Sequence, residues 1–148
     1  MDPAFYLVKT EPSTYSFEDL VREKRTAWDG VRNYEARNAL RAMKRGDSVL
    51  VYHSGKVRAV VGLAKVVRAA YQDPTTEDDF SAVDIAVQRA LERSVGLGEI
   101  KAHKKLSGLK LVTHSRLSVM PMSKAEFEEI LRLSERPEAA KPASARKA

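Results

Sequence analysis

The chain has 148 residues, 43% of them hydrophobic and 31% charged, which fits a single folded domain and leaves no room for a second one. Its 26 Lys and Arg residues against 20 Asp and Glu residues give a net charge of +6, which is as compatible with an anionic partner as with a merely soluble basic surface. Cysteine is absent, which excludes disulfide scaffolds, thiolate zinc sites, cysteine nucleophiles and cysteine-ligated deaminases.

The N-terminal segment predicts a strand followed by a short helix. Residues 5–8 are an apolar run that ends in a polar turn, where Pro12 prevents the strand from continuing. A helix is expected over residues 16–24, because Ser16 and Asp19 have the spacing of an N-cap residue and its partner in the first turn.

A second helix is expected after a loop at residues 28–33. Small and apolar side chains at positions 36, 39, 40 and 43 lie on one helical face, and Gly46 is the expected stop. Another face carries a row of cations, Arg37, Arg41 and Lys44. One side of this helix should therefore pack against the core while another presents positive charge.

The middle of the chain predicts three strands. Residues 48–53 and 59–67 are rich in β-branched side chains and are separated by a tight turn, which is typical of a hairpin. Gly62 inside the second run predicts a bulge or a close backbone approach. Alternation over residues 83–87 predicts a further strand, although the same residues also fit a helix.

The C-terminal third predicts a short helical piece at residues 98–102, a last strand at 117–120 closed by Pro121, and a final helix that begins with a capping box. In total about five strands and several short helices indicate an α+β domain with a mixed sheet curled toward a small barrel. Residues 135–148 hold Ala, Pro, Lys, Arg and Ser without a large apolar side chain, so we expect a flexible basic tail after a domain at residues 1–134.

Trp28 is the only tryptophan and the main candidate for ligand contact. An isolated tryptophan is more often a core residue. Its neighbours Asp29, Gly30 and Asn33, together with the basic helix that follows, instead favour a ring that stacks on a flat ligand.

Signatures of catalysis and of metal binding are missing from the sequence. It has no glycine-rich phosphate loop, nucleophile elbow or helical His-Glu pair, and its three histidines are widely scattered, so we expect neither a metal nor a cofactor. Two alternatives stay open. One is a hydrolase or nuclease in which Glu11, Asp29 or His53 acts as acid or base, and the other is an adaptor that binds protein or RNA through its basic surface.

Five ordered blocks of this sequence resemble the EVE domain, which is related to the PUA and YTH readers. The blocks are FYLVKTEPSTYSFEDL, WDGVRNYEARNALRAMKRGD, VLVYHS, VVGLAKVVRAAYQDPT and SRLSVMPMSKAEFEEIL, and the match runs from about residue 5 to residue 133. The chain departs from many relatives at Tyr6 and Phe80, where those proteins carry tryptophan.

The resemblance implies a PUA-like fold with a pocket that holds a modified base, such as a modified cytosine in DNA or RNA. The pocket residues it implies are Lys9, Thr10, Glu11, Trp28, Asn33, Tyr52, His53 and Ser54, with residues 115–118 at the border, Ser115 and Leu117 among them. The base would stack on Trp28, and amide and hydroxyl groups would read its edge.

We therefore expect a non-catalytic binding module whose partner is a nucleic acid carrying a modified base. Four cations, Arg32, Arg37, Arg41 and Lys44, are expected to bind the phosphates on either side of that base. No apolar run reaches the length of a bilayer span and no signal segment is evident, so the expected protein is cytoplasmic, or nuclear in a eukaryote, and has no membrane partner. A monomer is the expected state.

Overall fold

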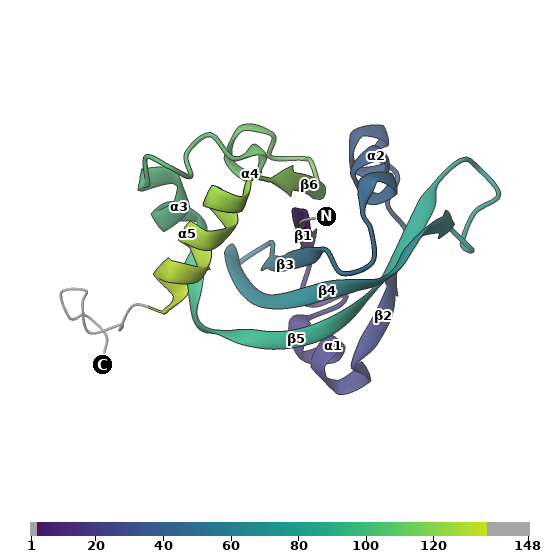
Figure 1. Cartoon of the computed structure of the whole chain (residues 1–148), viewed down its shortest axis with the longest axis horizontal. Coiled ribbons are helices and arrows are strands. Elements are labelled where there is room, and N and C mark those ends of the chain that lie inside the picture. Colours follow the sequence, from purple (N-terminus) through teal and green to yellow (C-terminus); the bar gives the residue numbers. More distant parts are fainter. Residues whose placement is uncertain (1–2, 136–148) are drawn as a thin grey trace.

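A computed structural model describes residues 3–135 of the chain. Within these residues one six-stranded sheet has the order β2-β5-β4-β3-β1-β6. The strands are β1 (Phe5–Thr10), β2 (Arg25–Trp28), β3 (Ser48–His53), β4 (Ala59–Gln72), β5 (Ser81–Gly96) and β6 (Val119–Met122). Only β1 and β3 pair in parallel, and the other neighbours are antiparallel. The α+β class and the curled mixed sheet are confirmed, and the sheet stays open (Figure 1).

Five helices surround this sheet in the described part of the chain. They are α1 (Phe17–Glu23), α2 (Tyr34–Ala42), α3 (Leu97–Ala102), α4 (Lys110–Thr113) and α5 (Lys124–Ser134). In Figure 1, α3, α4 and α5 gather at one end of the sheet, whereas α2 lies toward the long β4–β5 hairpin at the other end. None of these helices is long and apolar enough to cross a membrane.

Both predicted capping boxes are present. The Ser16 and Ser123 side chains accept hydrogen bonds from the backbone N–H groups of Asp19 and Glu126, whose carboxylates accept in return from the capping residues. The predicted core face of α2 is also confirmed, since Ala36, Ala39, Leu40 and Met43 are all buried. The pattern of apolar side chains and the chemistry of caps, both local signals, therefore located these helices correctly.

Gly62 combines both features predicted for it. The pairing of β4 with β5 shifts register between Val60 and Gly62, and the pairing of β4 with β3 shifts opposite that point. A Cβ at Gly62 would lie 2.2 Å from the ring of Phe17. The missing side chain therefore allows α1 to dock its first residue directly onto the β4 backbone.

The prediction of about five strands missed β2. Residues 25–28 form a short segment in which only Trp28 is buried, so their hydrophobic pattern is weak. They pair with β5 so that Trp28 lies opposite Val83. Trp28 thus ends a strand, and its predicted loop position was wrong. The helical alternative for residues 83–87 is also wrong, because β5 runs unbroken from Ser81 to Gly96.

Two predicted boundaries were also wrong. Helix α2 ends at Ala42 with Met43 as its cap, so Gly46, with φ of +94°, lies in the following turn and Lys44 lies outside the helix. Strand β6 includes Pro121, because an edge strand leaves one side of its backbone without a partner strand. The predicted basic tail lies outside the described residues, apart from its first residue.

Candidate functional site

A cavity of about 640 Å³ opens where the C-terminal end of β1 meets β2 and the loop that follows it. Its volume is in the range of small-molecule sites, about 300 to 1,000 Å³. It is lined by Lys9, Thr10, Glu11, Thr14, Tyr15, Thr26, Ala27, Trp28, Asp29, Gly30, Val31, Arg32 and Ser118. Two aromatic rings, several hydroxyl groups, two carboxylates and two cations thus share one hollow.

Trp28 belongs to the core and also forms part of the cavity wall. Only 9% of its surface is exposed. The Tyr15 ring meets the indole edge to face, with 6.1 Å between centroids and 85° between planes, and the Tyr15 hydroxyl donates to Glu23 at 2.7 Å. Packing therefore holds the indole in one orientation, so that the part of its surface that faces the cavity is fixed before any ligand arrives.

The end of β1 contributes three consecutive polar side chains to the cavity. Lys9 donates from Nζ to the carbonyl of Ser115 at 2.7 Å, and burial lowers the pKa of its amino group. The Thr10 hydroxyl donates to the Tyr15 carbonyl at 2.7 Å, which leaves its oxygen able to accept. The Glu11 carboxylate lies so close to Gly55 that a Cβ at that glycine would be 2.9 Å away from it. Donor and acceptor groups are thereby held side by side.

The loop after β2 is fixed by a buried carboxylate, Asp73. This side chain is inaccessible to solvent and accepts from the Gly30 backbone N–H at 2.8 Å, from Arg32 at 2.9 Å and from the Thr75 hydroxyl at 2.6 Å. Burial opposes its ionisation, but the hydrogen bonds from Thr75, Gly30 and Arg32 outweigh that effect and hold the pKa of Asp73 well below its usual range. Gly30 supplies the left-handed backbone that this loop requires, with φ of +77°.

The structure brings four of the predicted pocket residues to the cavity: Lys9, Thr10, Glu11 and Trp28. Ser115 borders it through the carbonyl that accepts from Lys9. Ser118 rather than Leu117 reaches the lining, since Leu117 is a buried core residue. Arg32, predicted to contact phosphate, is part of the wall as well.

Four other predicted pocket residues have structural partners and do not line this cavity. Asn33 caps α2, its Oδ1 accepting from the Ala36 N–H at 2.9 Å. Ser54 donates to the Thr10 carbonyl, and the buried Tyr52 ring lies 6.0 Å beneath Lys9 Nζ. His53 is 5% exposed, and its Nε2 accepts from the Phe17 N–H at 2.9 Å, so the proton of the neutral ring is on Nδ1. His53 is therefore poorly placed to act as an acid or base.

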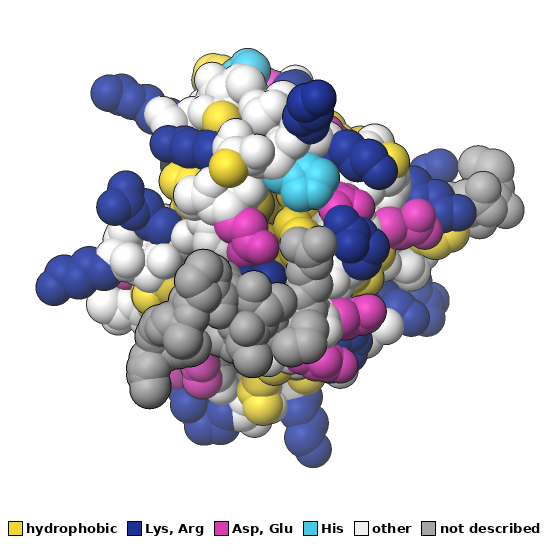
Figure 2. Space-filling view, turned by 90° about the vertical axis from the view of Figure 1, so that its left-hand side faces the viewer, with side chains coloured by type: hydrophobic (Ala, Val, Ile, Leu, Met, Phe, Trp, Pro, Cys, Tyr) yellow, Lys and Arg dark blue, Asp and Glu magenta, His cyan; other side chains and the backbone are white. Residues whose placement is uncertain are grey.

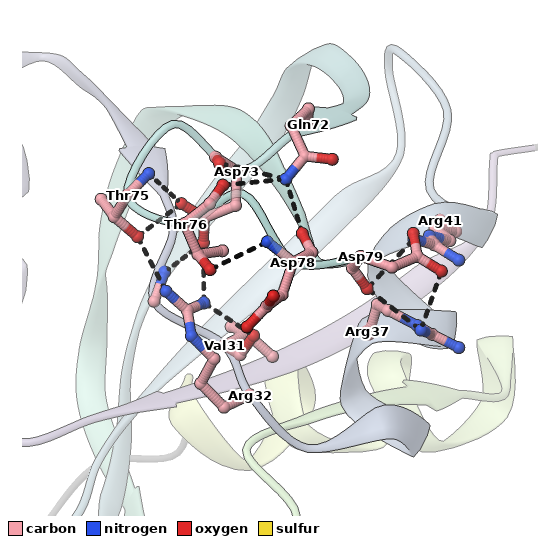
Figure 3. Close-up of polar contacts among 11 residues, drawn as sticks. Val31, Arg32, Arg37, Arg41, Gln72, Asp73, Thr75, Thr76, Asp78 and Asp79 are labelled. Atoms are coloured by element: carbon pink, nitrogen blue, oxygen red, sulfur yellow. Dashed lines mark hydrogen bonds and ion pairs between the residues drawn. The ribbon is translucent and has the colours of Figure 1, made fainter.

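The predicted phosphate-binding side chains of α2 contact the β4–β5 loop. Arg37 and Arg41 both reach Asp79 (Figure 3). Arg41 Nε also donates to the Ser81 hydroxyl at 2.8 Å. Lys44 is exposed beyond the end of the helix. A phosphate at Arg37 and Arg41 would therefore compete with an internal carboxylate.

Several lining residues were missed by the sequence reasoning. No role in the pocket was predicted for Thr14, Tyr15, Thr26, Ala27 or Val31. The side chains of Thr26 and Ala27 reach the cavity because β2 pairs with β5, a pairing that the weak pattern of residues 25–28 did not indicate. Asp29, predicted as a neighbour of the Trp28 ring and as a possible acid or base, lines the cavity together with Glu11. Among the described residues, no group of three His, Asp or Glu side chains is arranged to hold a metal ion.

Comparison with known proteins places this geometry in a family. The model of the EVE domain matches residues 4–133. This chain belongs to the EVE domain family. Its fold is PUA-like, and it resembles at the level of fold alone an ASCH protein from Zymomonas mobilis, which is 11% identical with a TM-score of 0.58 over 89% of this chain and 96% of that one.

One similar protein has been solved in complex with DNA. Thymocyte nuclear protein 1 from Mus musculus is 41% identical over 166 residues, covering 88% of this chain and 74% of that protein. The human THYN1 protein, solved in complex with 5-methylcytosine containing DNA, is 36% identical with a TM-score of 0.82, covering 90% of this chain and 99% of that one.

Proposed function

We propose that this protein is a non-catalytic module that binds DNA carrying a modified cytosine, with the modified base held in the cavity beside Trp28. The observation that carries the proposal is a preformed hollow that combines an aromatic wall with hydrogen-bonding groups. A flat polar ring requires both features. The relative solved with 5-methylcytosine containing DNA supports the choice of cytosine and of DNA.

The polar groups of the cavity match the edge of cytosine. Its exocyclic amino group is a donor and suits the carboxylate of Glu11 or Asp29, whereas its carbonyl oxygen is an acceptor and suits Lys9 Nζ. Ala27 and Val31 provide apolar surface for a methyl group at the ring. To reach these groups a base must leave its stack, and contact with Trp28 would return about 1 to 3 kcal/mol of that cost.

The single tryptophan makes the proposal directly testable. Titration with 5-methyl-2′-deoxycytidine should change Trp28 fluorescence at lower concentration than titration with 2′-deoxycytidine or 2′-deoxyadenosine. A labelled oligonucleotide with one 5-methylcytosine, followed by anisotropy, should bind Trp28→Ala about 5- to 150-fold more weakly, which corresponds to the loss of one stacking contact.

Because Trp28 also belongs to the core, Trp28→Phe serves as the second variant. It keeps an aromatic wall and should retain part of the affinity, while circular dichroism checks that both variants fold. Recovery of the intact nucleoside after prolonged incubation is expected for a binding module. A saturating fluorescence response that is equal for all the nucleosides, or conversion of the nucleoside to a new product, would contradict the proposal.

A further inference from the structure

The β4–β5 loop is attached to the rest of the protein at two points of opposite character. At its start, the buried Asp73 carboxylate accepts hydrogen bonds from Gly30, Arg32 and Thr75. At its end, Asp79 carries a side chain that is 77% exposed, yet it contacts two arginines of α2. The first attachment is structural, whereas the second lies on the surface, where solvent and ligands reach it.

Asp79 holds both arginines through its carboxylate and its backbone carbonyl. Arg37 Nη1 donates to the Asp79 carbonyl at 3.0 Å and to Oδ2 at 3.4 Å. Arg41 Nη2 donates to the same carbonyl at 3.4 Å and to Oδ1. Both guanidinium groups, one helical turn apart on α2, therefore converge on one small anion, as Figure 3 shows.

The carboxylate lies outside the two cations. The side chains of Arg37 and Arg41 are 16% and 37% exposed, so they are more protected than the 77% exposed Asp79 that covers them. Moving Asp79 aside uncovers the two guanidinium groups without opening the core. An ion pair whose carboxylate is this exposed to solvent is weak, so a competing anion displaces it readily.

A phosphodiester group suits this arrangement. Two guanidinium groups, each with several donors in one plane, can bind two oxygens of a tetrahedral phosphate, and arginine is well suited to such contacts. Arg37 is held over the Tyr34 ring at 4.8 Å and Arg41 by the Ser81 hydroxyl, so both stay in place when Asp79 leaves.

The arginine pair is connected to the cavity by a stack of side chains. Arg32, which lines the cavity, lies 5.2 Å from the centroid of Phe80. The Phe80 ring stacks on Tyr34, with 5.5 Å between centroids and 10° between planes, and Arg37 lies over Tyr34. A chain of side-chain contacts thus links the phosphate site to the cavity, and a strand with one base in the cavity can extend from one to the other.

We propose that Arg37 and Arg41 form a binding site for a backbone phosphate of nucleic acid, and that Asp79 occupies this site in the free protein as an internal phosphate mimic. The inference rests on the proposed function in that the strand reaches the site from the cavity. When the strand binds, its phosphate replaces the Asp79 carboxylate. Asp79 thereby weakens binding of nucleic acids in general and leaves discrimination to the cavity.

Asp79→Asn tests the proposal, with Glu128→Gln as the matched control. Both changes remove one negative charge, but Glu128 is an exposed residue of α5, at the opposite end of the molecule from the β4–β5 hairpin (Figure 1). Asp79→Asn should bind a labelled strand more tightly than the native protein, by up to about fivefold at low salt. Its plot of log affinity against log salt should be steeper by up to about 0.9.

The decisive comparison asks whether the gain in affinity disappears when the two arginines are replaced. In the background of Arg37→Gln with Arg41→Gln, Asp79→Asn should no longer tighten binding, because the site that it uncovers is absent. A folded Asp79→Asn protein that binds no more tightly would overturn the proposal. So would an equal gain for Glu128→Gln, or a gain that persists without the two arginines.

The same measurements separate this inference from the proposed function. The gain in Asp79→Asn should be the same for modified and unmodified strands, while affinity for free 5-methyl-2′-deoxycytidine stays unchanged. If the free nucleoside fails to bind but the gain depends on Arg37 and Arg41, the base-binding proposal fails and the phosphate site stands. If the nucleoside binds and the gain is missing, only the phosphate site fails.

Discussion

His53 ends β3 with its ring buried and its Nε2 accepting from the first backbone N–H of α1. Burial lowers the pKa of His53, and the carboxylates of Glu18 and Glu11 oppose that shift only in part. A neutral ring suits the acceptor role, because a protonated ring has no free lone pair. At this position, therefore, the histidine orients a helix, which is why it is unsuited to proton transfer.

The stability of the fold should depend on this histidine in mildly acidic solution. The unfolded chain takes up a proton near the ordinary pKa of 6.5, whereas the folded chain resists it, so the free energy of unfolding should fall as the pH drops below 6.5. Urea unfolding at pH 7.5 and pH 5.5 measures this loss. Replacing His53 by Gln, whose amide oxygen can accept, should reduce the difference between the two pH values.

Two further variants complete the His53 experiment. His53→Ala leaves the Phe17 N–H without its acceptor and should cost about 1 to 3 kcal/mol at pH 7.5. His114 is exposed, so His114→Gln should lose as much free energy of unfolding between pH 7.5 and pH 5.5 as the native protein does. A pH dependence that persists in His53→Gln would contradict the assignment.

At the scale of elements, the contact of α1 with β4 depends on the missing side chain of Gly62. A Cβ at Gly62 would lie 2.2 Å from the Phe17 ring, and the side chain of Phe17 is buried against the sheet. The capping box of Ser16 fixes the start of α1, so Phe17 has little freedom to move away. Local capping and a long-range backbone approach therefore determine the position of α1 together.

Gly62→Ala should destabilise the fold by about 1 to 3 kcal/mol, because the added methyl group overlaps a buried ring. The matched control is Gly98→Ala. Gly98 lies within α3, and a Cβ there meets no atom within 4 Å. That change should be neutral or stabilise the protein by up to about 1 kcal/mol. Thermal or urea unfolding distinguishes the two, and equal stability of both variants would refute the packing argument.

At the scale of the whole molecule, two carboxylates hold opposite ends of the sheet. Asp73 fixes the β4–β5 loop near α2. Glu129 pairs with Arg132 of the same helix and joins α5 to the end of α3 through His103 Nε2 at 2.7 Å. On the α3–α5 side, Lys and Arg side chains lie mostly around the edge and acidic ones nearer the middle (Figure 2). The whole chain has a net charge of +6, but on this face (Figure 2) the basic side chains are mixed with acidic ones.

Acid should unfold the protein partly through these carboxylates. Hydrogen bonds from Arg132 and then His103 lower the pKa of Glu129 to about 2 from its ordinary value of 4.5. Because the folded pKa is the lower one, this stabilisation is complete above pH 4.5 and is lost as the pH falls toward 2. Urea midpoints between pH 6 and pH 3 should therefore decline less steeply in Glu129→Gln, although that variant is less stable at pH 6.

The exposed Glu128 on the same helix provides the control for acid unfolding. Glu128→Gln should follow the native curve between pH 6 and pH 3, because no hydrogen bond of its carboxylate is needed for the packing of α5. An identical decline in Glu129→Gln and the native protein would exclude Glu129 as a source of acid sensitivity.

Local chemistry in the sequence determined most of the helices, the β3–β4 hairpin and half of the candidate site. Capping boxes, the apolar face of α2 and the glycine at position 62 act over a few residues, so they can be recognised from the sequence alone. The KTE segment at residues 9–11 and the lone Trp28 were likewise visible, although the functional reading of these residues came from the family resemblance and remains a prediction.

Only the tertiary structure decided which of the candidate residues share the cavity. Strand β2 forms because β5 supplies partners for an otherwise polar segment, and that pairing brings Thr26 and Ala27 to the cavity. His53 was assigned to the pocket, but its ring accepts from the start of α1, and Arg37 and Arg41 meet Asp79 about 40 residues later in the chain. Hydrogen bonds between distant segments follow from how the sheet curls, and no spacing in the sequence encodes them.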